Sequence, residues 1–510
     1  MVGDDKTEAG KSASVAGIKE RLRGIAKWRP GPGLYAACAV TALILLLWPL
    51  LRMAGYSVPW YDDYNYGRYA KTALEADPTI RGALKGAKDC ITMSWYAWQG
   101  TYGSIFFMTL MPGVWGEEYY HLGPVFLILL LAVSVGVLVY VLLRDVLRAD
   151  RVHAVGIAAV SAAMAEFLIY TSQQGFYWYN GGVHYVGMHS FALLLTAVCV
   201  KILCADRVWK QCIWMVAGAG LGFVVAGGNY VTCLQGLLLV LSLIGAGCIG
   251  RRKQTVFLLP VLAVYVRGFS WNVGAPGNAN RAASYVGWGM SPLRSILYSF
   301  VEAAGHVWEF TGWMTIVLAA LMLPMIAHMV KRTGFRFRLP GMVSLWSFCL
   351  YATGFTPSLY SLGHAGLDRA LNAVKLTWQM LLILNLVYWC GWLCQKKNLS
   401  GRMYRWWFYP AMAAAALAAF WAEPDRVLHF SSYGAYHYVH TGEAYNFYQE
   451  YLERVEILKS DAAIAEFTPY HWRPWPICMG DLSGNPQDES NRALEAYYGK
   501  DGVICVEREE

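Results

Sequence analysis

Long apolar runs alternate with short polar segments along most of the chain. A membrane-spanning helix needs about 20 largely apolar residues, which is longer than the apolar run of a buried strand or a short core helix. The runs that meet this length centre on residues 34–54, 122–143, 152–171, 183–203, 211–228, 230–249, 254–270, 311–330, 340–356, 374–394 and 406–422. The pattern therefore predicts an all-α polytopic membrane protein with about eleven transmembrane helices.

The connections between these runs differ in charge. Every second connection is short and rich in Lys and Arg, and together with the N-terminal segment these connections hold more than half of the 42 basic residues. Because basic loops stay on the cytoplasmic side, we expect a cytoplasmic N-terminus and an external C-terminus. Three parts follow: a basic cytoplasmic segment 1–33, a transmembrane domain 34–422 whose first external loop is 55–121, and an external C-terminal cap 423–510.

Composition narrows the class of protein further. Of the 510 residues, 56% are apolar and 15% charged, where a soluble domain carries about 25% charged residues. The formal net charge of +8 would suit nucleic acid, but the basic residues flank membrane spans, so a soluble enzyme and a nucleic-acid partner are excluded. The tail pattern predicts helices at 443–459 and 488–498, and a bridge between Cys478 and Cys505 is left open.

The first external loop opens with two adjacent carboxylates, Asp62 and Asp63, just beyond the first span. At a membrane boundary the lower dielectric raises the pKa of a carboxyl group and makes it a better base. One of the two can instead cap the helix expected at 64–76. Asp63 lies closer to the helical run and is the expected cap, which leaves Asp62 as the expected base. A second amphipathic helix at 86–99 and an apolar patch at 105–111 should lie on the membrane surface.

A second external segment combines flat aromatic rings with an amide and glycines. It contains Trp178, Tyr179, Asn180 and His184. Aromatic faces beside an amide suit sugar rings, although the same residues could form an aromatic belt at the interface. Glu166 lies in the outer third of the preceding span, where a charged group faces a polar cavity or is kept protonated for structural reasons.

Basic residues recur at the outer ends of later spans. Arg281 ends a turn-rich loop, Arg369 follows another Gly-rich turn, and Lys375 comes six residues later. A guanidinium group binds phosphate oxygens bidentately, although snorkelling to lipid headgroups would also place such residues here. Because a lipid phosphate needs more than one donor group, Arg281 and Arg369 are expected to converge, with Lys375 adding a point charge.

The acidic pair after the first span, the surface helices of the first external loop and the basic residues of later external loops together resemble the GT-C glycosyltransferase superfamily. The chain resembles more closely a family of bacterial multi-pass proteins that is thought to be GT-C-like. The resemblance covers most of the chain and rests on the segments YDDYNYG, QGFYWYNGGVHY, APGNANR, TPSLYSLGHAGLDR and NRALEAYYGK.

The resemblance implies transfer of a sugar from a polyprenyl-phosphate donor to an envelope glycan or lipid-linked acceptor on the outer face of the bacterial cytoplasmic membrane. In GT-C enzymes an acid of the first external loop is the catalytic base, which corresponds here to Asp62 or Asp63. The donor-phosphate residues Arg281, Arg369 and Lys375 match only in kind and in side of the membrane. No cofactor is implied, and use of a divalent metal is left open.

Two other classes of function remain open on the residues alone. A transporter or flippase of lipid-linked sugars would also need an aromatic cavity and arginine clamps, although such proteins usually carry repeated halves and broken helices, which are not visible in this sequence. A non-catalytic envelope assembly partner would use the acidic pair only as a cap.

Overall fold

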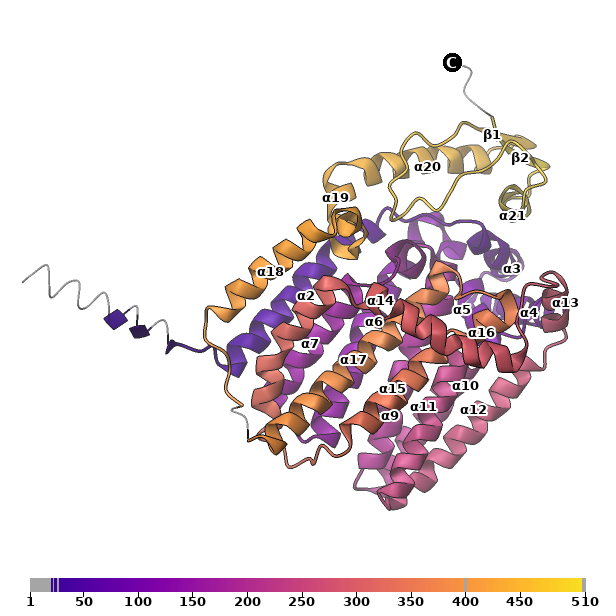
Figure 1. The fold of residues 1–510 in the computed structure, drawn as a ribbon. Helices are drawn as coiled ribbons and strands as arrows, with labels where there is room; N and C mark the ends of the chain where they lie inside the picture. Colours follow the sequence, from indigo (N-terminus) through magenta and orange to yellow (C-terminus); the bar gives the residue numbers. More distant parts are fainter. Residues whose placement is uncertain (1–19, 22, 25–26, 399–400, 507–510) are drawn as a thin grey trace, which may run out of the picture.

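The computed structural model describes residues 20–21, 23–24, 27–398 and 401–506. The predicted N-terminal segment 1–33 lies mostly outside the described residues. Within them the chain is nearly all-α, as predicted, with two short strands. Figure 1 shows a bundle of inclined helices that carries further elements at one end.

The bundle elements follow one another in chain order. They are α2 (Pro32–Ala54), α6 (Leu122–Val141), η3 (Leu142–Val146), α7 (Arg151–Phe167), η4 (Gln173–Tyr177), α8 (Tyr179–Gly182), η5 (Val183–Gly187), α9 (Met188–Cys204), α10 (Val208–Ala226), α11 (Tyr230–Ile249), η6 (Lys253–Phe257), α12 (Leu258–Val273), α14 (Pro292–Val330), α15 (Pro340–Ala352), α17 (Asp368–Lys396) and α18 (Phe408–Ala422).

Eight continuous helical segments of the described chain are long and apolar enough to cross a membrane. They are Pro32–Ala54, Glu117–Val146, Tyr179–Cys204, Val208–Ala226, Tyr230–Ile249, Lys253–Val273, Pro292–Val330 and Asp368–Lys396. These helices identify a multi-pass membrane protein. The other three predicted spans correspond to shorter helices, α7, α15 and α18, of 17, 13 and 15 residues.

Helix α14 joins two pieces across a kink at Gly312, whose φ of 58° and ψ of 172° are non-helical. The predicted span at 311–330 corresponds to the piece after the kink. The piece before it falls in a segment that the sequence pattern leaves as an external loop. Its exposed side chains include Leu293, Leu297 and Val301, spaced four residues apart, so this piece presents an apolar face to its surroundings.

Shorter elements gather at the end of the bundle where the C-terminal part lies. They are α3 (Asp62–Ala76), α4 (Ile80–Ala97), α5 (Tyr102–Thr109), η1 (Pro112–Trp115), η2 (Glu117–Tyr119), α13 (Gly277–Ala283) and α16 (Thr356–Leu362). Helices α3 and α4 correspond to the two predicted surface helices of the first loop. They approach closely at Gly86, where an added Cβ would lie only 2.4 Å from the carbonyl oxygen of Tyr69.

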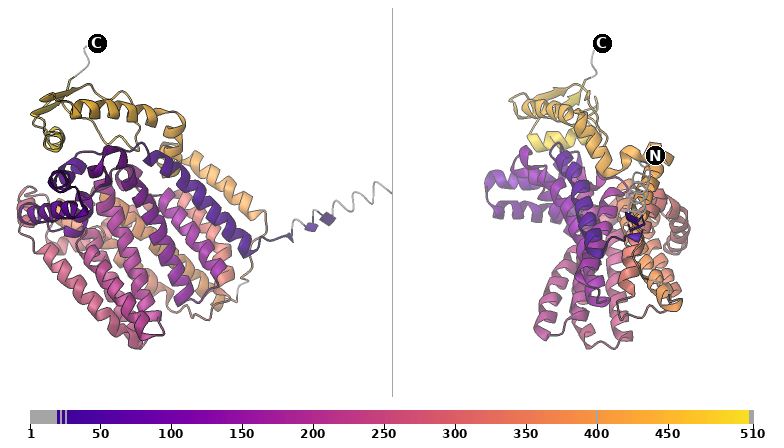
Figure 2. Two further views of the ribbon diagram at one scale, coloured as in Figure 1. Left: turned by 180° about the vertical axis from the view of Figure 1, so that it is seen from behind. Right: turned by 90° about the vertical axis from the view of Figure 1, so that its left-hand side faces the viewer.

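The cap comprises η7 (Pro424–His429), α19 (Ser431–His440), α20 (Glu443–Lys459), β1 (Ile464–Phe467), α21 (Glu489–Tyr498) and β2 (Gly502–Cys505). The two strands pair in parallel, and α20 and α21 match the helices predicted in the tail. Both views place the cap over the end of the bundle that carries α3 (Figures 1 and 2). Cys478 and Cys505 are unbridged in this structure.

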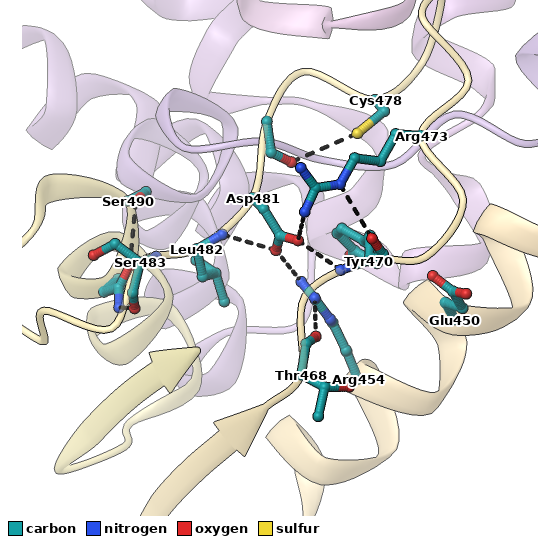
Figure 3. Close-up of polar contacts among 12 residues, drawn as sticks. Glu450, Arg454, Thr468, Tyr470, Arg473, Cys478, Asp481, Leu482, Ser483 and Ser490 are labelled. Carbon is teal, nitrogen blue, oxygen red and sulfur yellow. Dashed lines mark hydrogen bonds and ion pairs between the residues drawn. The ribbon is translucent and has the colours of Figure 1, made fainter. Parts of the chain in front are cut away.

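A network around Asp481 holds the turns of the cap together (Figure 3). Arg454 donates to the Asp481 carboxylate at 2.7 Å, and the backbone N–H groups of Tyr470 and Leu482 donate to the same carboxylate at 2.7 and 2.9 Å. The Arg454 guanidinium also lies 3.4 Å from the centre of the Tyr470 ring. These charge-assisted bonds fix the segment that connects β1 to α21.

The cap is joined to the first loop by polar contacts. Glu117 accepts a bond from Tyr498 at 2.7 Å and pairs with Lys459 at 2.6 Å. Lys71 of α3 donates to the carbonyl oxygen of Tyr497 at 2.6 Å. The cap and the first loop therefore form one surface above the bundle.

The kink at Gly312 gives a direct test of the fold. We expect Gly312→Ala to lower the free energy of unfolding by about 1–3 kcal/mol, because only glycine adopts this backbone conformation without strain. Gly305→Ala in the same helix is the matched control. An added Cβ at Gly305 meets no atom within 4 Å, so this change should be neutral or slightly stabilising. Melting of both variants in detergent compares them, and equal melting temperatures would contradict the kinked backbone.

Candidate functional site

The site begins at the junction between α2 and α3, where the backbone is strained. Tyr61, the N-cap of α3, has a φ of 33° and a ψ of −88°, a conformation that non-glycine residues rarely adopt. Such outliers persist only when surrounding contacts hold them. The Tyr61 hydroxyl donates to the carboxylate of Glu489 in the cap. The next two residues are Asp62 and Asp63.

Asp63 is fully buried and accepts bonds from three segments of the chain. Its Oδ2 accepts from the backbone N–H of Trp60 at 2.9 Å and from the hydroxyl of Tyr120 at 2.8 Å. Its Oδ1 accepts from the backbone N–H of Asn180 at 2.9 Å. Burial raises the pKa of Asp63 to about 7, although these three donors and their hydrogen bonds oppose the rise.

This arrangement corrects the expectation that Asp63 is a helix cap. The N-cap residue is Tyr61, and its side chain makes no capping bond. Asp63 instead joins the start of α3 to Tyr120 near the start of α6 and to α8. A simple cap satisfies the helix's own backbone, whereas this carboxylate connects elements that lie 57 and 117 residues away in sequence.

Asp62 has a different environment. It is half-buried, and within the described residues no hydrogen bond or ion pair occupies its carboxylate. Burial raises the pKa of Asp62 to about 6; the positive charge of Arg369 lowers it, and the negative charge of Glu489 raises it. Asp62 is thus a half-buried carboxyl group whose oxygens have no partner among the described residues, and the positive charge of Arg369 is felt there.

Two arginines from distant loops lie close enough to one histidine for their positive charges to affect its ring. The positive charges of both Arg281 and Arg369 act on the His184 ring, and Arg369 also acts on Asp62. Arg281 donates to the side-chain oxygen of Gln99 at 2.5 Å. The structure therefore brings together four of the predicted site residues: Asp62, His184, Arg281 and Arg369.

Local contacts explain how Arg281 reaches this position. Asn278, in the same helix α13, accepts a bond from the backbone N–H of Gly100 at 3.3 Å and one from the hydroxyl of Tyr230 at 2.7 Å. Gly100 allows this approach, because an added Cβ there would lie 2.0 Å from the carbonyl oxygen of Asn272. The loop with Arg281 is therefore held against the end of α4.

The aromatic segment contributes polar atoms rather than open ring faces. The Arg369 guanidinium lies 5.5 Å from the centre of the Trp178 ring. The side chains of Trp178 and Tyr179 are both buried. Tyr179 lies against Gly123. In contrast, Trp178 Nε1, both polar atoms of the Asn180 amide and His184 Nδ1 are buried without a hydrogen-bond partner in the described part of the chain. Buried polar atoms usually have partners, so these atoms mark a polar site.

Lys375 and Glu166 lie apart from this cluster. Lys375 lines a separate cavity beside Tyr170. Six residues along a helix correspond to about 600°, which places Lys375 and Arg369 on different faces of α17. Glu166 is fully buried in α7 near Tyr177 and does not act on the carboxyl group of Asp62. The expected contribution of Lys375 to the Arg281–Arg369 clamp does not fit this placement.

Some residues of the site were not expected from the sequence. Gln99 holds Arg281, and Glu489 acts on Asp62 from the cap. Gln99 follows an amphipathic helix without any distinguishing pattern, and Glu489 lies more than 400 residues from Asp62, so neither carries a local signal. Across the described residues, no group of three or more His, Cys, Asp or Glu side chains is placed to hold a metal ion.

Comparisons with protein-family models, with curated proteins and with solved structures found no match for this chain.

The role of Asp63 in the fold can be tested by substitution. In Asp63→Asn one acceptor oxygen becomes an NH₂ group that faces buried donors, so at least one of the three donors loses its partner. We expect a loss of about 1–3 kcal/mol in the free energy of unfolding for each donor left unpaired. Thermal melting at pH 8 measures it. Tyr120→Phe removes one donor to Asp63 and also the acceptor of the backbone N–H of Tyr179, so it should lower the melting temperature as well. Unchanged melting of Asp63→Asn would contradict the assigned role.

Proposed function

We propose that this chain is a glycosyltransferase that moves a sugar from a polyprenyl-phosphate donor to an envelope glycan or lipid-linked acceptor. The observation that carries the proposal is the gathering of Asp62, His184, Arg281 and Arg369 at the cap end of the bundle. It joins a carboxyl group suited to a base with two guanidinium groups suited to a phosphate. The buried unpartnered atoms of Asn180 and His184 add polar groups for a ligand.

The proposed reaction uses these groups in defined roles. The Asp62 carboxylate takes the proton of an acceptor hydroxyl as its oxygen forms a bond to the anomeric carbon of the donor sugar. The bond from that carbon to the lipid phosphate breaks, and the phosphate leaves with the electron pair. Arg281 and Arg369 stabilise the negative charge of the leaving phosphate. In a partly buried site, fixed positive charges attract the phosphate more strongly than they would in water.

The proposal includes a topology with eleven spans and the cap outside. Helices α7, α15 and α18 are shorter than the eight candidate membrane spans, but they run beside the longer helices of the bundle (Figure 1). The basic connections alternate as the positive-inside rule requires. On this basis the protein lies in the bacterial cytoplasmic membrane with its site on the outer side. There a lipid-linked donor is needed, because nucleotide sugars are not available.

The assignment of Asp62 as the base predicts a specific loss of turnover. We expect Asp62→Asn to lower the rate by about 10²–10⁴-fold with donor binding largely kept, because the amide cannot accept the hydroxyl proton. Turnover is measured in membranes at matched protein level, with lipid extracted from cells that lack the protein as donor. Asp89→Asn, at an exposed aspartate of α4, is the matched control and should keep its activity.

The pH profile separates a base from a structural carboxyl group. A base acts when deprotonated, and the pKa of Asp62 is about 6, so kcat/KM should fall about tenfold per pH unit below pH 6. This dependence should be present in Asp89→Asn and absent from the residual activity of Asp62→Asn. Equal turnover of the two variants would contradict the assignment of Asp62 as the base.

A further inference from the structure

A polar cavity lies beside the N-terminal end of α17, where Asp368 and Lys375 line it. Its volume is about 330 Å³, and it is bounded by the chain after α7, the kink of α14, α17, η7 and one turn of the cap. Near it, the side-chain amide of Asn372 on α17 both accepts from and donates to the backbone of Thr171, at 2.9 and 3.1 Å, and Thr171 lines the cavity whereas Asp62 does not. The proposed transfer reaction does not use this cavity.

The cavity contains charges of both signs. Three are acidic and three are basic or titratable: Glu309, Asp368, Glu423, Lys375, Arg426 and His429. Some of them already have partners, since Arg426 lies 3.8 Å from Glu423 and Glu309 accepts a bond from Tyr170 at 2.9 Å. Within the described chain, Lys375 and Asp368 have neither a hydrogen bond nor an ion pair.

The two unpartnered charges share one face of α17. Seven residues correspond to about 700°, so Asp368 and Lys375 lie nearly in line, with Lys375 about 10 Å further along the helix into the bundle. Asp368 begins the helix at the cap end, where the membrane surface is expected. The order from the surface inward is therefore a carboxylate and then an ammonium group.

Apolar and aromatic residues surround these charges. The cavity wall includes Met314, Phe430 and Trp475. Next to the wall, Trp313 exposes 49% and Trp421 exposes 86% of its surface, and exposed tryptophans are typical of the membrane interface. A ligand that occupies this cavity would meet lipid on one side and charged groups on the other.

We propose that this cavity binds the headgroup of a phospholipid that carries a primary amine. In such a lipid the phosphate lies next to the acyl chains and the ammonium group lies further out, which matches the order of Lys375 and Asp368. Lys375, with Arg426 nearby, pairs with the phosphate. Asp368 accepts N–H bonds from the ammonium group, with the Glu309 carboxylate in the same cavity. The proposal does not depend on sugar transfer.

The test compares three lipids on the full chain purified in detergent. Native mass spectrometry measures retention of dioleoyl phosphatidylethanolamine, phosphatidylcholine and phosphatidylglycerol. Phosphatidylethanolamine should be retained at least about tenfold better than the other two, because choline has no N–H donor and glycerol has no positive charge. Equal retention of all three would overturn the proposal. Water-soluble phosphoethanolamine should not displace the lipid, and displacement would overturn the assignment to a lipid.

Two variants assign the charges. Lys375→Gln should lower the retention of phosphatidylethanolamine about tenfold. Lys85→Gln, at an exposed lysine of α4, should leave it unchanged. Asp368→Asn should remove the preference for ethanolamine over choline while keeping phosphate binding. Melting temperatures confirm that each variant is folded before lipid is added. Retention by Lys375→Gln equal to that by Lys85→Gln would overturn the proposal.

Discussion

The buried carboxylate of Asp63 is the constraint on which the geometry at the cap end of the bundle depends. A carboxylate removed from water is costly unless donors satisfy its oxygens, and here the donors come from three separate segments. Satisfying Asp63 therefore fixes the start of α3 relative to α6 and α8. In contrast, no hydrogen bond or ion pair within the described residues occupies the carboxylate of its neighbour Asp62.

The N-terminal end of α17 is a second organising feature, because it separates two polar regions. Arg369 faces Trp178 and acts on Asp62 and His184. Lys375 faces a cavity that holds Glu309 and Arg426. The helical rotation between the two basic residues produces this division. One helix end thus lies between two polar regions of different chemistry, one with a carboxyl group and two guanidinium groups and one with mixed charges and apolar walls.

Much of the helical architecture could be predicted from the apolar runs, because their length alone defines a spanning helix. The kink at Gly312 and the pairing of β1 with β2 could not, since both depend on tertiary contacts rather than on local pattern. Among the site residues, the loops with Arg281 and Arg369 were found through their turn-forming sequences. The division between Arg369 and Lys375 follows from helical rotation, whereas the three donors to Asp63 could not be read from the sequence.

We propose that a sugar leaves a lipid phosphate at the site of Asp62. The most direct measurement is the lipid-linked sugar content of cells that lack the protein, compared with cells that express the unchanged chain or Asp62→Asn. We expect one polyprenyl-phosphate sugar to accumulate on the outer side of the membrane without the protein and with Asp62→Asn, and to return to its normal level with the unchanged chain. No accumulation in the cells that lack the protein, or a normal level with Asp62→Asn, would contradict the account.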